Sequence, residues 1–250
     1  MTTGPATRRL DAWTALAVVG LCALWGSNQI AMKIANAGLS PVFQASVRSA
    51  GAALLLLGWC AVRRVPLFSG DLRIGYGVAI SALFSLEFAL LYSGLLYTSA
   101  SRAVLFLHMA PFVVATGAHF LLPGERLRGW RLCGLALAFT GLALAFADGL
   151  RLPRGRELLG DSLELCAAVG WGATTLVIKA RGRGVDPHLT LVYQLAGSVL
   201  PLWLISRALG EAGVIALTPP VVASMAYQIV VIATFSYLAW IWLLARYPDR

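Results

Sequence analysis

The chain has 250 residues, of which 59% are apolar and only 12% are charged. Soluble domains are nearer half apolar and a quarter charged, so this composition excludes an ordinary soluble enzyme and predicts a protein that lies in a membrane. We therefore interpret the net charge of +9 as loop charge that sets membrane topology, and we expect no nucleic-acid partner.

Apolar segments follow one another along the chain, and several exceed the about 18 residues that mark a membrane-spanning helix. They are apolar on all sides, so we expect them to face lipid or one another. A kink is expected at Pro111, inside the fourth segment. The eight predicted spans are residues 12–35, 41–62, 74–98, 101–122, 130–147, 159–180, 187–209 and 219–245.

One stretch of the chain recurs at a fixed offset, since Trp25-Gly26 returns 146 residues later as Trp171-Gly172. The same offset relates three further pairs, Lys33 to Lys179, Pro41 to Pro187, and Gly51 to Gly197. We infer an internal duplication. It predicts a first repeat over residues 1–147, a connecting loop at 148–158 and an incomplete second repeat over 159–250.

Lys and Arg near the span ends indicate orientation, because they favour the cytoplasmic side. A cytoplasmic N-terminus is favoured, since it places thirteen of these residues inside and six outside. The inner set is Arg8, Arg9, Arg63, Arg64, Arg73, Arg126, Arg128, Arg131, Lys179, Arg181, Arg183, Arg246 and Arg250. The outer set is Lys33, Arg102, Arg151, Arg154, Arg156 and Arg207.

The first repeat contains five spans, and because this number is odd the second repeat must begin on the opposite side of the membrane. The two units are therefore predicted to be inverted relative to one another. Inverted repeats are typical of alternating-access transporters, whose substrate site lies between the two units.

Four sequence segments are similar to one known family. They read LWGSNQIAMKIANAGLSPVFQASVR at 24–48, YTSASRAVLFLHMAPFVVA at 97–115, LLPGERLRGWRLCGLALAFTGLAL at 121–144 and LGDSLELCAAVGWGATTLVIK at 159–179. In order and spacing they closely resemble the EamA family of the drug/metabolite transporter superfamily, and the resemblance covers nearly the whole chain.

The resemblance implies an all-α polytopic protein of the cell inner membrane, an inverted-repeat helical bundle with cytoplasmic termini. It implies a secondary active transporter that exports an amino acid, another metabolite or a drug-like solute. An ion gradient or the gradient of the substrate would drive it. No cofactor is expected, and the sequence contains no GxxxxGK[ST] loop for ATP.

The sequence departs from the family in one respect, because it ends after the eighth predicted span where the family continues to ten. One alternative is therefore a truncated membrane fragment or a non-transporting scaffold. An intramembrane enzyme is a weaker alternative, because Glu87 with His108 is the only loose catalytic pair.

Charged residues inside a membrane are functional candidates, because they cost about 2.5–3.5 kcal/mol on insertion scales. Arg48, Glu87, His108 and Asn28 lie at comparable depth, roughly 10–16 Å from the outer side at 1.5 Å per residue, and we predict that they line one substrate cavity. Arg48 could hold a substrate carboxylate, pair with Glu87, or act as a structural tie. Glu87 is the candidate for proton coupling, since burial favours the neutral form of a carboxyl group.

Aromatic residues supply candidates for the cavity wall, although anchoring at the membrane interface or plain packing is the alternative for each. These are Trp25, Tyr92, Trp171 and Tyr227. The four cysteines and the histidines show no ligand spacing, so no metal site is expected. The expected partners are a small-molecule substrate and the lipid bilayer. Ion or proton coupling and a homodimer are left open.

Overall fold

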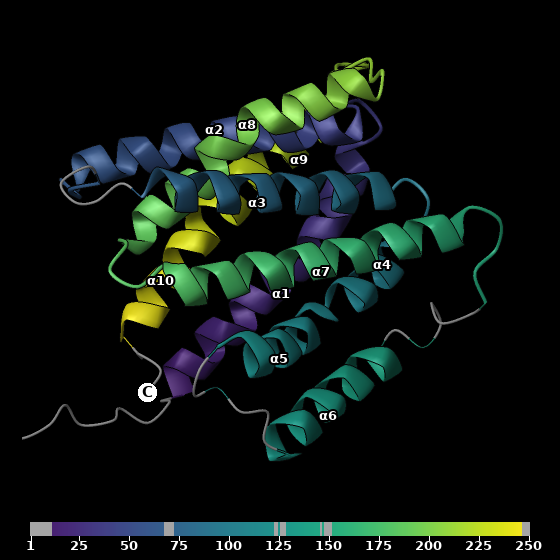
Figure 1. Ribbon diagram of the computed structural model, residues 1–250. Coiled ribbons are helices and arrows are strands. Elements are labelled where there is room, and N and C mark those ends of the chain that lie inside the picture. The colour runs from purple at the N-terminus through teal and green to yellow at the C-terminus, as the bar shows by residue number, and fades with distance from the viewer. Residues whose placement is uncertain are drawn as a thin grey trace, which may run out of the picture.

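The computed structural model describes residues 12–67, 73–122, 125, 129–145, 147 and 152–246, which form a helical bundle without a strand (Figure 1). The helices are α1 (Ala12–Ala35), α2 (Pro41–Val62), α3 (Ile74–Gly94), α4 (Ala100–Leu107), α5 (Ala110–Leu121), α6 (Gly129–Ala145), α7 (Glu157–Arg181), α8 (Pro187–Ala208), α9 (Pro219–Ala226), η2 (Tyr227–Ser236) and α10 (Tyr237–Arg246). Several basic residues used for topology lie outside the described residues, namely Arg8, Arg9, Arg126, Arg128, Arg151 and Arg250.

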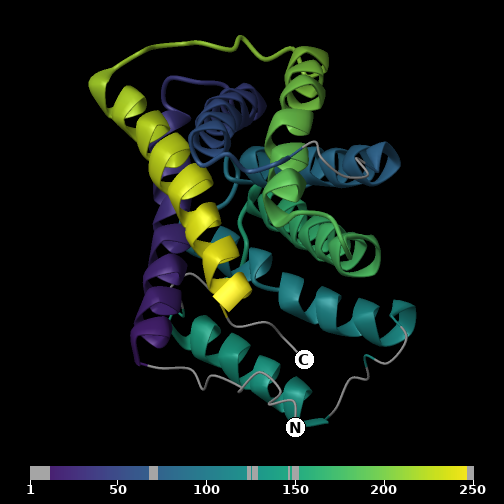
Figure 2. The same cartoon turned by 90° about the vertical axis from the view of Figure 1, so that its left-hand side faces the viewer.

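Within the described residues, seven helices are long and apolar enough to cross a membrane by length and composition. Two of them combine shorter elements: α4 runs on into α5, and α9 runs on into η2 and α10. The predicted fifth span is the shorter helix α6, in which no described side chain is buried. Figures 1 and 2 show α6 at the edge of the bundle, so its apolar surface suits contact with lipid. The prediction of an all-α polytopic membrane protein is confirmed.

The break in the fourth span lies close to the predicted kink. Helix α4 ends at Leu107, and α5 begins at Ala110 with Pro111 in its first turn. Proline has no backbone N–H and its ring clashes with the carbonyl four residues earlier, here that of Leu107. The eighth span differs from expectation, because residues 227–236 form a π-helix rather than an α-helix.

Two pairs of loops meet at opposite ends of the bundle. At the first end, Arg73 Nη1 donates to the carbonyl oxygens of Arg181 and Arg183, both at 2.9 Å. At the second end, Ser40 N donates to the Gly213 carbonyl at 2.8 Å. Helix α2 has 22 residues and connects the two ends, which are therefore about 33 Å apart at 1.5 Å per residue.

These loop contacts fix the relative direction of the two units. Helix α1 ends at the second end, in the turn before Ser40, whereas its repeat equivalent α7 ends at the first end, beside Arg73. The inverted arrangement predicted from the odd number of spans is therefore present in the structure (Figure 1).

Helix packing repeats the same symmetry. A methyl group on Gly51 of α2 would lie 2.8 Å from Ile229 Cδ1 in η2, and one on the matching Gly197 of α8 would clash with Ser81 of α3. The second helix of each unit thus approaches the third helix of the other unit at a glycine. Figure 2 shows the last helical rod, formed by α9, η2 and α10, crossing beside α1. In the same way, α3 packs along α7.

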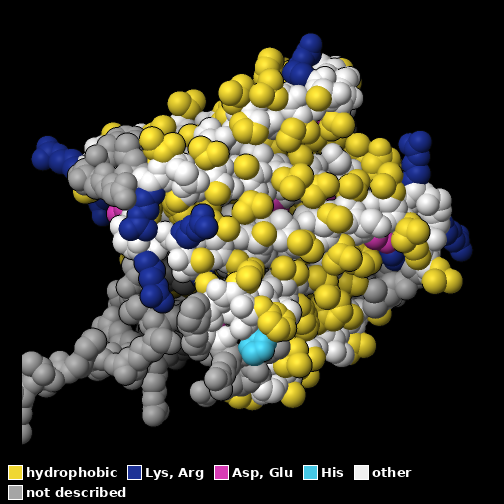
Figure 3. All heavy atoms as spheres, viewed as in Figure 1, with side chains coloured by type: hydrophobic (Ala, Val, Ile, Leu, Met, Phe, Trp, Pro, Cys, Tyr) yellow, Lys and Arg dark blue, Asp and Glu magenta, His cyan; other side chains and the backbone are white. Residues whose placement is uncertain are grey.

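The core lies where α2, α3, α7 and α8 meet, and much of the remaining surface is apolar. Figure 3 shows apolar side chains across the face between the two ends, with Lys and Arg gathered toward the ends. This distribution suits a bilayer, because charged groups then lie at the water boundaries and hydrocarbon contacts the middle.

The close approach of α3 and α7 can be tested at Gly160. A methyl group there would lie 2.7 Å from Thr98 N and 2.9 Å from the Gly94 carbonyl oxygen, and backbone atoms cannot yield without separating the helices. We expect Gly160→Ala to cost about 1–3 kcal/mol and to lower the melting temperature in detergent. The control Gly58→Ala has no atom within 4 Å of the new methyl group and should leave the melting temperature unchanged. Equal losses in both variants would contradict this packing.

The pairing of loops predicts the side from which each loop can be labelled. In a cysteine-free background, Arg63→Cys and Arg183→Cys should react with an impermeant maleimide from the same side of intact vesicles, because both residues lie at the first end. Ala212→Cys, exposed beside the second end, should react only from the other side. Labelling of the first two positions from opposite sides would overturn the inverted fold.

Candidate functional site

Arg48 of α2 is the largest fully buried side chain among the described residues. Its Nη2 donates to the Tyr237 hydroxyl at 3.2 Å, and its guanidinium carbon lies 4.6 Å from the centroid of the Phe88 ring. Its Nε and Nη1 are buried without a hydrogen-bond partner. The cation is thus held by aromatic faces, with two of its three nitrogens available to an acceptor.

Glu87 of α3 precedes Phe88 and is also buried. Phe88, the next residue, packs against the Arg48 guanidinium, but Glu87 and Arg48 form no ion pair in the part of the chain that the structure describes. Glu87 instead lies against α7, where a methyl group on Gly170 would be 3.3 Å from Glu87 Cβ. The structure therefore separates the two charged candidates and places Glu87 at the boundary between the units.

Tyr92 belongs to a buried polar cluster that includes two residues the sequence analysis did not select. The Tyr92 hydroxyl donates to Gln228 Oε1 at 2.8 Å, and Gln44 Nε2 donates to the same oxygen at 3.3 Å. Both glutamines are fully buried. Their sequence signal was an amide side chain inside an apolar run, which needs a partner when it leaves water.

The α1 candidates also contact the last helical rod. Trp25 Nε1 donates to Ser236 Oγ at 2.8 Å, and the Tyr227 hydroxyl lies 2.7 Å from Ser27 Oγ. Asn28 is buried, with Nδ2 3.3 Å from Met32 Sδ and Oδ1 without a partner.

The π-helix η2 supplies several of these contacts, because Tyr227, Gln228 and Ser236 all lie within it. A π-helix repeats its hydrogen bonds from residue i to i+5, so its side chains point in directions that an α-helix would not give. Helices α1, α2 and α3 of the first unit thus place polar groups against one widened helix of the second unit. Such segments occur frequently at functional sites.

Two predicted residues lie away from this group. His108 is exposed at the break between α4 and α5, with Nδ1 2.6 Å from the Val104 carbonyl oxygen. Trp171 is half-buried on α7 and packs against the edge of the core. The shared cavity predicted for Asn28, Arg48, Glu87 and His108 stays a prediction.

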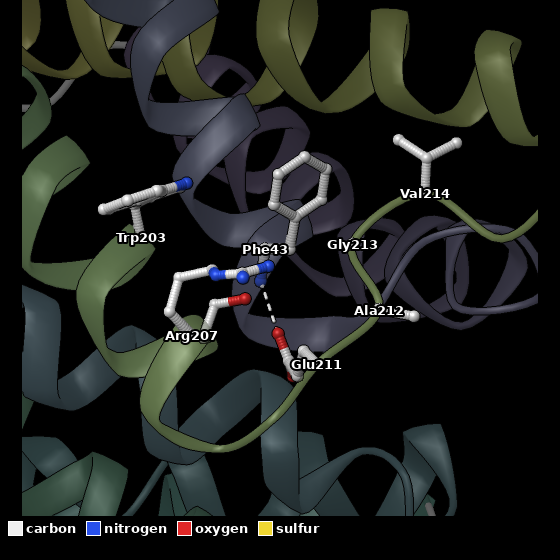
Figure 4. A pocket seen from close by; sticks show the side chains of 8 residues that line it. Phe43, Trp203, Arg207, Glu211, Ala212, Gly213 and Val214 are labelled. Carbon is white, nitrogen blue, oxygen red and sulfur yellow. Dashed lines mark hydrogen bonds between the residues drawn. The ribbon is translucent and has the colours of Figure 1, made fainter.

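A hollow of about 320 Å³ lies at the second end of the bundle (Figure 4). Phe43, Trp203 and Arg207 line it, and Glu211 closes one side by accepting hydrogen bonds from the backbone N–H groups of Val42 and Phe43 at 3.0 and 2.8 Å. None of the predicted site residues lines this hollow. Arg48, Glu87 and Tyr92 are instead buried in the bundle.

Known proteins resemble this chain over nearly its whole length. A protein of Escherichia coli (strain K12) named "Probable amino-acid metabolite efflux pump" is 29% identical over 249 residues, covering 96% of this chain and 79% of the relative. The "Uncharacterized transporter YoaV" of Bacillus subtilis (strain 168) is 21% identical over 92% of this chain and 78% of the relative.

A solved structure described as "Crystal structure of protein" superimposes with a TM-score of 0.72 at 17% identity, covering 96% of this chain and 81% of that one. This similarity concerns the fold alone. The EamA-like transporter family matches residues 12–147, which is more than half of the chain. The chain therefore belongs to the EamA-like transporter family and is a multi-pass membrane transporter.

Proposed function

We propose that the protein is a secondary carrier that exports a small carboxylate-bearing metabolite, such as an amino acid, across the inner membrane by alternating access. The observation that carries this proposal is Arg48, whose Nε and Nη1 are buried without a partner at the contact between the two units. A buried unpaired donor costs about 1–3 kcal/mol, and a carboxylate can accept from two guanidinium nitrogens at once.

The name of the Escherichia coli relative supports the choice of substrate class, since it refers to amino-acid metabolites. The aromatic surroundings of Arg48 also fit. Phe88 and Tyr237 flank the guanidinium, and such a wall accepts an apolar side chain beside the charged group.

The basic residues at the first end support the proposal of a cytoplasmic N-terminus. Arg63, Arg64 and Arg73 lie at the first end with Lys179, Arg181 and Arg183, and basic residues accumulate on the cytoplasmic side. Helix α1 begins at this end, so the first end faces the cytoplasm in the proposed orientation.

Proton coupling is proposed for Glu87. The carboxyl group is buried without an ion-pair partner among the described residues, and a carboxylate that is buried without such a partner tends to take up a proton. Its position between α3 and α7 places it where rocking of the two units would change its access to water.

The role of Arg48 is tested by uptake and counterflow in vesicles that contain the purified protein. Arg48→Gln should raise the KM for a transported amino acid about 10–100-fold, because a charge-assisted hydrogen bond contributes about 1.5–3 kcal/mol and 1.4 kcal/mol is tenfold. The matched amine that lacks the carboxylate should be handled equally by both proteins. Arg154→Ala, at an exposed position, is the control. Unchanged discrimination between acid and amine in Arg48→Gln would exclude the contact.

The role of Glu87 is tested by imposing a pH gradient across the same vesicles. Glu87→Gln should lose the flux that the gradient drives, while substrate exchange without a gradient continues, because the amide cannot release a proton. Glu125→Gln removes an exposed carboxylate that pairs with Lys179 at 3.1 Å and should keep gradient-driven flux. If Glu87→Gln still responds fully to the gradient, another group carries the proton.

A further inference from the structure

Helix α7 carries a second carboxyl group inside the bundle, that of Glu164. The side chain is fully buried, and neither Oε1 nor Oε2 has a hydrogen-bond partner. Glu164 lies seven residues into α7, or about 10 Å from its start at 1.5 Å per residue. A buried carboxylate with no partner is costly, and such a group normally becomes neutral.

The charged groups around Glu164 do not compensate a negative charge. Its neighbour Asp161 is the carboxylate that Arg102 of α4 contacts, with Arg102 Nε 3.0 Å from Asp161 Oδ1, and Thr98 Oγ1 donates to the same oxygen at 2.6 Å. Asp161 repels a second negative charge, and Lys33 near the end of α1 opposes this effect. Lys33 is exposed and forms no ion pair with Glu164 in the described part of the chain.

Two acceptor oxygens of α7 lie beside Gly94 of α3. A methyl group on Gly94 of α3 would lie 2.9 Å from Glu164 Oε1 and 3.1 Å from the Gly160 carbonyl oxygen, so both oxygens face one spot on α3. A carboxylate has no donor to offer a carbonyl oxygen, whereas a carboxylic acid has one O–H. Among the described residues no donor is bound to either Glu164 oxygen, so the burial of this carboxyl group favours its neutral form.

Glu87 and Glu164 both lie at the contact between α3 and α7, one on each helix. Glu87 reaches from α3 toward Gly170 of α7, while Glu164 reaches from α7 toward Gly94 of α3. Gly170 is six residues beyond Glu164, which corresponds to about 9 Å along α7. Helix α3 belongs to the first unit and α7 to the second, so a movement between the units changes the surroundings of both carboxyl groups.

We infer that Glu164 is a second proton-binding site, protonated in this closed state and deprotonated when α3 and α7 move apart and water reaches it. The proton leaves to water, and Glu164 remains as the carboxylate until the contact closes again. The consequence for transport rests on the proposed proton-coupled function: each cycle then exchanges one proton at Glu87 and one at Glu164.

The protonation itself can be tested without transport. Dicyclohexylcarbodiimide reacts with protonated carboxyl groups in apolar sites. In the wild-type protein at neutral pH we expect mass spectrometry to find the adduct on Glu164, with faster labelling as the pH falls. Exposed Glu125 should not be labelled. An unlabelled Glu164 at every pH where the protein stays folded would overturn the inference.

Infrared difference spectra between neutral and alkaline pH give a second readout. The wild type should show the C=O stretch of a buried carboxylic acid. Glu164→Gln should lose the part of this band that comes from protonated Glu164, whereas Glu87→Gln should keep that part. Gln has the shape of the neutral acid, so Glu164→Gln should keep the melting temperature of the wild type at neutral pH. A spectrum identical to that of the wild type would contradict the site.

Coupling is measured as the membrane potential at which net flux reverses. Glu164→Gln should carry one proton less per substrate than the wild type. Equal stoichiometry in both, or a loss of dependence on Na⁺ instead of on pH, would overturn the coupling role. If the wild type moves no tested substrate, the proposed function fails, and the carbodiimide and infrared results still decide whether Glu164 binds a proton.

Discussion

The packing of α3 against α7 is the contact on which the rest of the structure depends. It joins the first unit to the second, and it is close because Gly160 meets the backbone of Gly94 and Thr98 without an intervening side chain. At one end of this contact Thr98 and Arg102 bind the Asp161 carboxylate. This ion pair ties α7 to α4, and breaking it would leave a charge unpaired in the bundle, which is expensive in low-dielectric surroundings.

The same contact explains why the interior holds ionisable groups that do not neutralise one another. Glu87 and Glu164 extend from opposite helices, each toward a glycine of the facing helix, and neither forms an ion pair among the described residues. Arg48 lies on α2 and is held by Phe88 and Tyr237 instead. A stable soluble core would avoid such unpaired groups, whereas a transporter needs sites that change their protonation or their ligand as the two units move.

Helix η2 gives the second unit a partly different contact surface from the first. Helix α3 is a regular α-helix, but its repeat equivalent is widened over residues 227–236. The inverted symmetry is therefore preserved in the path of the chain and in the glycine contacts at Gly51 and Gly197. It is broken at the polar cluster, where Gln228 accepts from both Tyr92 and Gln44. An asymmetric site between symmetric units suits a substrate that has no symmetry itself.

The sequence by itself determined the membrane-embedded helical bundle, the position of the spans and the inversion of the units, because apolar length and the odd number of spans leave little choice. It also placed Arg48 and Glu87 at a similar depth. It did not determine which way each helix turns its side chains. A helix that is apolar on all sides has no stripe that fixes its rotation. Only packing therefore decided that Arg48 faces Tyr237 and that His108 faces outward. It also decided that, among the described residues, Asp161 pairs with a cation whereas Glu164 does not.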